Sequence, residues 1–478
     1  MKLERATPES VGISSQALLK FLKAVQCHEI HSFMLLKDGK VICERWWEPY
    51  GSIYRHQLYS LSKSFTSTAV GMAVDEGRLT VDTLLSDIFK TEFKSLDIRI
   101  DDEVRRMTIK HLLIMSTGME YEGWAPWDSQ NPEVNHIVSF LSSHVKDEPG
   151  QIFRYSSIAT YMLSAAITRL TGETLVEYMR PRLFEPLGIT PHWGLDEKMG
   201  VHAGGFGLNV TTEDIAKFGQ FILQKGEWQG KQLVSAEWIE EATGWHIQSE
   251  SFSRDGENDW TQGYGYQFWR CKPEGVFRGD GMFGQFCVIV PSMNMVIVAN
   301  SNGAMDQVLD LFWDMLEDIK TLPADGRGAV ELLAYDGFSH LDTSEVGEDY
   351  PVLLAEYEME DGSSLIFDGV GNECLISIKC IGRPFVVYRF VKGKWIKGAA
   401  PNIFTPYAIP NEKMYRVITY GVWKNHIFEA TTWHYESASR DQHRFIFNKD
   451  FSQVTMESRT GAFDSPFEVK GTGKRKPD

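Results

Sequence analysis

The feature that most constrains the fold of this chain is the tetrad Ser60-Leu61-Ser62-Lys63, because it opens an amphipathic helix. The apolar positions that follow recur at helical spacing: Phe65, Ala69, Met72 and Ala73. Residues three apart share one face of a helix, so Lys63 is expected beside Ser60. A lysine that burial keeps neutral can take the proton of a serine hydroxyl, and the amides at a helix N-terminus favour developing negative charge.

The same four-residue pattern occurs a second time, at Ser143-His144-Val145-Lys146. This second copy runs into the acidic turn 147–150, whereas the first opens an apolar helix. The first copy also follows an alternating segment from His31 to Trp47 around Asp38-Gly39, which predicts a β-hairpin. We therefore expect the nucleophile at Ser60 and none at Ser143.

Composition limits the partners that the chain can have. Its formal net charge of -17 argues against nucleic acid and anionic lipid. No apolar run reaches membrane-spanning length and the first residues lack a signal-peptide core, so we expect a cytoplasmic protein without a membrane partner. The six cysteines have no CxxC spacing, and no His, Cys and carboxylate set has metal-ligand spacing. We accordingly predict no metal and no cofactor.

The 478 residues predict more than one domain. Helical patterns from about residue 60 to 243 lie between strand patterns, which return at Tyr264–Trp269 and Phe286–Ser301 and are followed by a helix at Asp306–Lys320. This order predicts an α+β domain over residues 1–322, with an antiparallel sheet flanked by helices and a helical subdomain. A linker is predicted over residues 323–349.

From residue 350 to 478, short alternating strands are separated by turns with Gly or Asn. This pattern predicts a C-terminal antiparallel β-barrel, which we expect to be lipocalin-like. The basic stretch Lys470–Lys476 is expected to be a disordered end.

Two further segments carry candidate site residues. In the loop 149–157, which leads into a helix, the Tyr155 phenol could pass a proton to a leaving group, particularly if a lysine lowers its pKa, and Ser157 could bond Lys63 or substrate. Gly279-Asp280-Gly281 heads a hydrophobic strand and could bring a backbone N–H to an oxyanion. Taken alone, each segment also fits a purely structural loop or hairpin. Three tryptophans in polar loops are expected to line the pocket: Trp124, Trp127 and Trp260.

Together, these three segments resemble the serine β-lactamase and penicillin-binding-protein superfamily, whose motifs are Ser-x-x-Lys, Tyr-x-Asn or Ser-x-Asn, and Lys-Thr-Gly. The resemblance is to the class C β-lactamase-related branch, which includes esterases, D-aminopeptidases and 6-aminohexanoate-oligomer hydrolases. It spans roughly residues 7–320. Supporting segments lie at 108–118, 184–189, 212–219 and 264–266.

The resemblance implies a serine β-lactamase/DD-peptidase-like fold, with Ser60 as nucleophile, Lys63 as its base partner and Tyr155 as general acid/base. Two departures bear on the substrate. Ser157 stands where β-lactamases have an asparagine that binds the substrate amide, and Gly279-Asp280-Gly281 replaces Lys-Thr-Gly and its cation. Arg278 is adjacent, but strand alternation would point it away from the site if its neighbour faces inward.

The expected function is hydrolysis of a small ester or amide through an acyl-enzyme on Ser60, with Ser157 and Gly279, Asp280 and Gly281 at the substrate or the oxyanion. One alternative is a peptidase of the D-amino-acid or cell-wall class, or a β-lactamase. A second is a degenerate hydrolase that only binds ligands. The expected partner is a small ester or amide substrate, and the chain could form a homo-oligomer.

Overall fold

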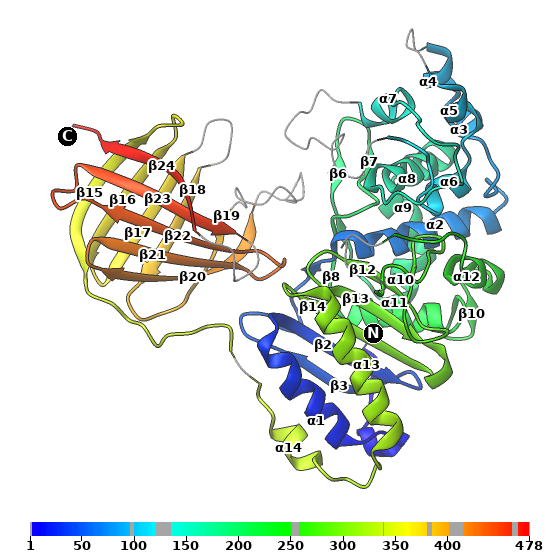
Figure 1. The fold of residues 1–478 in the computed structure, drawn as a ribbon, viewed down its shortest axis with the longest axis horizontal. Coiled ribbons are helices and arrows are strands. Elements are labelled where there is room, and N and C mark those ends of the chain that lie inside the picture. The colour runs from blue at the N-terminus through cyan, green and yellow to red at the C-terminus, as the bar shows by residue number, and fades with distance from the viewer. Residues whose placement is uncertain are drawn as a thin grey trace. The chain divides into compact units, whose positions relative to one another are not determined.

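The structure is a computed structural model that describes residues 2–95, 100–120, 135–250, 258–337, 339–379, 385–400, 414–460 and 467–477. The chain forms two compact units. The first unit contains Met1–Arg45 and Gln57–Gly337, and the second contains Trp46–His56 and Phe338–Asp478. Figure 1 shows the fold of each unit.

The first unit is built on a seven-stranded sheet in the order β1-β3-β2-β14-β13-β12-β11. These strands are β1 (Glu4–Arg5), β2 (Ile30–Lys37), β3 (Lys40–Trp46), β11 (Trp269–Arg270), β12 (Phe277–Gly281), β13 (Gln285–Val290) and β14 (Met295–Ser301). The hairpin predicted around Asp38-Gly39 is confirmed as β2–β3, and β14 pairs antiparallel with β2. The sheet thus joins strands from both ends of the region, as the sequence pattern predicts.

Helices cover both faces of this sheet. On one face, α1 (Ser15–Ala24) packs against α13 (Met305–Thr321), and the ring of Phe33 in β2 lies 4.7 Å from that of Phe21 and 6.4 Å from that of Phe312. On the other, α11 (Thr212–Leu223) packs so closely that a Cβ at Gly219 would lie 2.5 Å from Val296. The α+β class with an antiparallel sheet is confirmed.

A helical region follows the hairpin and contains α2 (Ser62–Asp75) and α8 (Ser157–Thr171), which pack against each other. Both helices begin where the sequence pattern predicts. Its other helices are α3 (Leu85–Ile88), α4 (Lys90–Ser95), α5 (Asp102–Arg106), α6 (Ile109–Leu113), α7 (His136–Leu141), α9 (Leu175–Met179), η4 (Arg180–Phe184), α10 (Glu185–Leu187) and α12 (Ala236–Thr243). Short elements elsewhere in the unit are η1 (Pro8–Val11), η2 (Val25–Cys27), β4 (His56–Gln57), η3 (Tyr59–Leu61), β5 (His192–Trp193), β6 (Leu195–Asp196), β7 (Val201–His202), β8 (Leu208–Val210), β9 (Glu227–Trp228), β10 (Lys231–Gln232), η5 (Pro291–Met293) and α14 (Ala329–Ala334).

The second unit is an antiparallel barrel of ten strands in up-and-down order, because strands that follow one another in the chain pair with each other, except β18 and β19. The first strand, β15, pairs with both the second, β16, and the last, β24. The strands are β15 (Tyr350–Met359), β16 (Ser364–Gly371), β17 (Glu373–Lys379), β18 (Val386–Val391), β19 (Ile396–Ala400), β20 (Tyr415–Lys424), β21 (Ile427–His434), β22 (Arg440–Phe447), β23 (Gln453–Thr460) and β24 (Glu468–Arg475). The Thr419 hydroxyl donates to the carbonyls of Arg389 in β18 (2.6 Å) and Ile396 in β19 (3.3 Å), and so draws the two ends of the sheet together.

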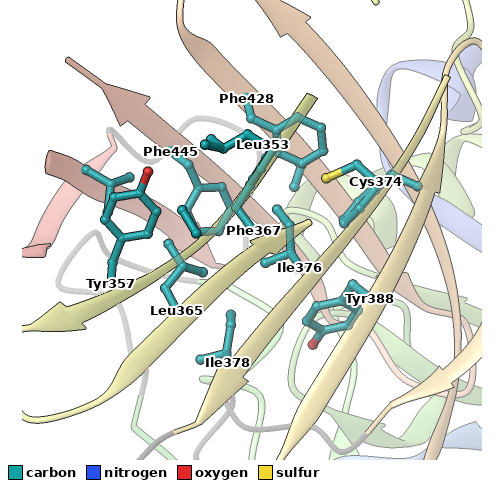
Figure 2. Close-up of a cluster of buried hydrophobic side chains, with 14 of the residues drawn as sticks. Leu353, Tyr357, Leu365, Phe367, Cys374, Ile376, Ile378, Tyr388, Phe428 and Phe445 are labelled. Atoms are coloured by element: carbon teal, nitrogen blue, oxygen red, sulfur yellow. The ribbon is translucent and has the colours of Figure 1, made fainter. Parts of the chain in front are cut away.

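The barrel interior is filled by apolar side chains, ten of which are labelled in Figure 2. Aromatic rings meet there edge to face, as in the pairs of Phe367 with Phe428 (5.7 Å) and with Phe447 (5.2 Å). The predicted C-terminal barrel is therefore confirmed. It has two strands more than the eight of a lipocalin.

The structure contradicts two sequence-based expectations. Lys470–Lys476 was expected to be a disordered end, but residues 468–475 form β24, which pairs with β15 and β23 and joins the first strand of the barrel to its last hairpin. The strand expected at Tyr264–Trp269 is reduced to Trp269–Arg270, because Gln267 has a φ of 66°, which extended backbone cannot adopt. The predicted domain boundaries at residues 322 and 350 stay a prediction.

The second unit also contains residues 46–56, a segment between β3 and β4 that no sequence pattern assigns to it. The Tyr50 ring meets Trp433 of β21 edge to face at 6.2 Å, and the Tyr50 hydroxyl donates to the Ser437 carbonyl at 3.3 Å. Tyr54 lies 4.9 Å from Tyr435. This segment therefore packs with the barrel strands although it lies between two segments of the first unit. No helix in the described parts of the chain has the length and apolar character needed to cross a bilayer.

Candidate active site

Ser60 lies in the one-turn helix η3, at the junction between β4 and α2. The residue before it, Tyr59, has a φ of 47°, in the left-handed region that bulky residues avoid. This conformation is held from two sides: the Ser62 hydroxyl donates to the Tyr59 carbonyl at 2.6 Å, and the Tyr59 ring packs edge to face on Phe283 at 5.2 Å. The sharp turn places Ser60, only 8% exposed, at the start of the helical segment.

Lys63 is 1% exposed, and its Nζ contacts three oxygens. They are Ser60 Oγ at 3.0 Å, Ser157 Oγ at 3.0 Å and the Gly205 carbonyl at 2.7 Å. Burial lowers the pKa of Lys63 to about 7, and the charge of Asp280 opposes that shift. A carbonyl can only accept, so the neutral amine donates one N–H to the Gly205 carbonyl and can donate the other to the Ser157 hydroxyl. Its lone pair then remains for the Ser60 proton.

Tyr155 lies next to this pair. Lys63 Nζ is 4.7 Å from the centre of the Tyr155 ring, and the phenol is hydrogen-bonded to Ser60. Burial raises the pKa of Tyr155 above its ordinary value, and Asp280 raises it further, whereas Ser60 and Arg278 lower it. The sequence allowed for a lysine that lowers this pKa, whereas the net shift is upward and burial is its largest cause. At neutral pH the phenol keeps its proton and can act as a donor.

Strand β12 lies directly against the turn that carries Ser60. A Cβ at Gly281 would lie 2.1 Å from the Leu58 carbonyl and 3.1 Å from the Ser60 backbone nitrogen. A Cβ at Gly279 would lie 2.5 Å from Leu61 and 2.6 Å from the Ser64 hydroxyl. Glycine allows this close approach at both positions. Position 279, where the resemblance places a lysine, therefore has no side chain to supply a cation.

Asp280 lies between these glycines, is 6% exposed, and bonds to two side chains. Arg278 Nε donates to its Oδ2 at 2.9 Å, and Trp260 Nε1 donates to the same oxygen at 3.1 Å. Arg278 therefore shares the strand face of Asp280 and pairs with it, on the face opposite to that of the Gly279 position, which lies against Leu61 and Ser64. Burial raises the pKa of Asp280, while Arg278 and Trp260 oppose the shift.

The structure thus brings together Ser60, Lys63, Tyr155, Ser157, Gly279, Asp280 and Gly281. The second tetrad is different: Lys146 has a side chain that is 58% exposed and lies 4.0 Å from Glu120, and the Ser143 hydroxyl donates to the Ser139 carbonyl. Trp260 is buried beside Asp280, whereas the expectations for Trp124 and Trp127 fall outside the described residues.

Among the described residues, no three His, Cys, Asp or Glu side chains are grouped so that they could hold a metal ion, and the five described cysteines are free thiols.

Sequence reasoning missed the Gly205 carbonyl, which accepts from Lys63. The turn that contains it is fixed by a second bond, from the Thr66 hydroxyl to the Gly204 carbonyl at 2.9 Å. Gly205 also approaches α8 closely, since a Cβ there would lie 2.8 Å from the Ser157 carbonyl. The two successive glycines were the available signal, because they allow a backbone to approach its neighbours closely.

A family model described as Beta-lactamase matches residues 31–316, which is more than half of the chain. The chain therefore belongs to the β-lactamase family, among the hydrolases of the serine β-lactamase superfamily. The family resemblance seen in the three motifs is confirmed.

Two curated proteins and one solved structure illustrate the likeness. The chain is 25% identical over 288 residues to 6-aminohexanoate-dimer hydrolase of Paenarthrobacter ureafaciens, which covers 57% of this chain and 72% of that one. It is 31% identical over 151 residues to lovastatin esterase of Penicillium rubens, and this match covers 28% of this chain and 38% of the esterase. The octameric penicillin-binding protein homologue from Pyrococcus abyssi covers 96% of this chain and 98% of its own, with a TM-score of 0.50 and 16% identity, which shows a common fold.

Proposed function

We propose that this protein is a serine hydrolase that cleaves a small ester or amide through an acyl-enzyme on Ser60. The observation that carries the proposal is the contact of a buried lysine, whose pKa is lowered to about 7, with the Ser60 hydroxyl at 3.0 Å. A protein that only bound a ligand would gain nothing from this costly arrangement. The names of the two curated relatives, a dimer hydrolase and an esterase, support the same chemistry.

In the proposed first step, Ser60 Oγ attacks the substrate carbonyl while the Lys63 lone pair takes its proton. Ser157 and the Gly205 carbonyl hold Lys63 in the orientation that aims this lone pair at Ser60. The Tyr155 hydroxyl then donates its proton to the leaving oxygen or nitrogen. Lys63, now protonated, restores the Tyr155 proton, and water releases the acid from Ser60.

The developing oxyanion would lie between the Ser60 amide and the backbone of β12. Support comes from the close approach of Gly281 to the Ser60 nitrogen, since a Cβ there would lie 3.1 Å away. Preorganised backbone donors of this kind stabilise a tetrahedral intermediate by about 3–4 kcal/mol each. The glycines at 279 and 281 thus allow the strand to reach the reacting atoms.

A fluorophosphonate probe tests the proposal directly. The probe should label one serine, and peptide mapping should place the label on Ser60. A protein that binds ligands without hydrolysis would stay unlabelled. A screen of acyl nitrophenyl esters against aminoacyl nitroanilides would then decide between ester and amide substrates, and would include the D-aminoacyl compounds that a peptidase prefers. Homo-oligomer formation and a cytoplasmic location stay predictions of the sequence.

The pH dependence should follow the protonation of Lys63. Since only the neutral amine can accept the Ser60 proton, kcat/KM for an uncharged ester should rise about tenfold per pH unit below about 7 and level off above it. The sign follows from burial, which lowers the pKa of a lysine. Initial rates with 4-nitrophenyl acetate, read at the nitrophenol isosbestic point, would measure the curve. A rise centred near 10 would instead mean that Lys63 is protonated at neutral pH.

Penicillins and cephalosporins should be poor substrates. Gly279 has no side chain and so lacks the cation that would bind their carboxylate, and Arg278 is already paired with Asp280. A charge-assisted bond contributes about 1.5–3 kcal/mol, so its loss costs roughly ten- to a hundredfold in rate. Ser157 also replaces the amide-binding asparagine. Steady-state rates on nitrocefin and on 4-nitrophenyl esters would check this, and equal efficiency on both would contradict the argument.

A further inference from the structure

Strand β12 presents two different faces. Gly279 and Gly281 lie against Leu58–Ser64, while Arg278 and Asp280 alternate with them and form an ion pair in which the two side chains are 0% and 5% exposed. An ion pair is therefore buried on the same strand that touches the Ser60 backbone. Its acidic partner, Asp280, stands where the superfamily resemblance places the threonine of Lys-Thr-Gly.

Arg278 is held on several sides, yet part of its guanidinium is unused. Its Nη1 donates to the Asp259 and Arg270 carbonyls at 3.2 Å each and to Cys271 Sγ at 3.3 Å. Its Nη2 is buried and has no hydrogen-bond partner among the described residues. A guanidinium has five N–H donors, so these contacts do not use the full hydrogen-bonding capacity of Arg278, although Asp259 lies 4.0 Å away as a second carboxylate.

The pair lies close to the reacting groups. Arg278 Cζ is 5.9 Å from the centre of the Trp269 ring system, and Trp269 stacks on the Tyr155 ring at 5.5 Å. Asp280 raises the pKa of both Lys63 and Tyr155, and Arg278 lowers that of Tyr155. The negative charge of Asp280 thus acts on both Lys63 and Tyr155, the two groups that would transfer protons. The same charge would repel a negative charge on a bound substrate.

We propose that Asp280 is a specificity-determining residue, whose carboxylate excludes negatively charged acyl groups and which Arg278 and Trp260 hold in place. The site would then select neutral or cationic acyl groups. This inference rests on the acyl-enzyme function proposed above. Like charges in a site shielded from water repel strongly, and such a repulsive element is a common source of specificity.

Neutralising Asp280 should change this selectivity, because it removes the carboxylate that lies 2.9 Å from Arg278 and leaves that guanidinium with only the more distant Asp259, at 4.0 Å. The repulsion between Asp280 and a substrate carboxylate would then be gone. The expected change is therefore a gain in activity on an anionic substrate relative to a neutral one, which a residue of purely structural importance would not produce.

The test compares two esters with acyl chains of the same length, 4-nitrophenyl butyrate and the mono-4-nitrophenyl ester of succinate. The wild type should prefer butyrate at least tenfold in kcat/KM, and Asp280→Asn should raise the succinate-to-butyrate ratio at least tenfold. Asp214→Asn is the matched control, since Asp214 forms a buried pair with Lys217 at 3.0 Å in α11. It should leave the ratio unchanged.

If Asp280→Asn does not fold, the double variant Arg278→Met/Asp280→Asn decides, because uncharged replacements of a buried ion pair are often tolerated. Its ratio should exceed that of the wild type by at least threefold, since the repulsion is gone. A wild-type ratio near one, or unchanged ratios in the folded variants, would overturn the proposal. Wild-type protein that hydrolyses neither ester and takes up no fluorophosphonate would instead refute the hydrolase function.

Discussion

Ser60→Ala is expected to abolish ester hydrolysis, with a fall in turnover of about six orders of magnitude, the loss seen when a serine nucleophile is removed. The reason is the position of Ser60 Oγ, 3.0 Å from the amine of Lys63 and bonded to the Tyr155 phenol. The variant should fold, because only one oxygen is removed from a position at a helix start. Turnover of 4-nitrophenyl butyrate and fluorophosphonate labelling would both be measured.

Ser143→Ala is the matched control, because Ser143 has the same sequence pattern without the same surroundings. Its lysine partner in the pattern, Lys146, has a side chain that is 58% exposed and lies 4.0 Å from Glu120. Its hydroxyl donates to the Ser139 carbonyl at 2.8 Å. This variant should keep wild-type activity. Retained turnover in Ser60→Ala would refute the acyl-enzyme mechanism.

The sequence predicts those parts of the fold that depend on local periodicity. Alternation around Asp38-Gly39 identified the hairpin β2–β3, and helical spacing identified α2 and α13. It failed at Lys470–Lys476, because a stretch with two glycines and four basic residues has no apolar alternation. That stretch becomes a strand only through its neighbours β15 and β23, whose backbone groups pair with it.

The candidate site was predictable in its residues but not in its contacts. Order and spacing indicated Ser60, Lys63 and Tyr155, and spacing along one helix placed the first two side by side. The glycines at 204 and 205 indicated a close backbone approach but not its partner, because Gly205 lies 142 residues from Lys63 and any residue type offers a carbonyl. The Arg278–Asp280 pair was missed for another reason: residues two apart share one face of a strand, but the sequence reasoning did not consider that these two side chains could pair there.

Tyr155→Phe is expected to lower turnover by about two to four orders of magnitude, the usual contribution of a positioned acid or base. The ring should stay in place, because its stacking on Trp269 at 5.5 Å and its contact with Lys63 at 4.7 Å do not involve the hydroxyl. Loss of the phenol removes the proton donor for the leaving group. The effect should therefore be largest for substrates with a poor leaving group, such as amides, and smaller for nitrophenyl esters.

The control for this variant is Tyr161→Phe, the same substitution in a tyrosine that is 1% exposed in α8. The Tyr161 hydroxyl donates to the Asp196 carboxylate at 3.0 Å, so the control loses a hydrogen bond worth about 1.5–3 kcal/mol of stability without touching Ser60. Tyr161→Phe should keep its turnover on both substrates. If Tyr155→Phe also kept full turnover on an amide while remaining folded, Tyr155 would have no part in proton transfer, and the leaving group would have to take its proton from Lys63.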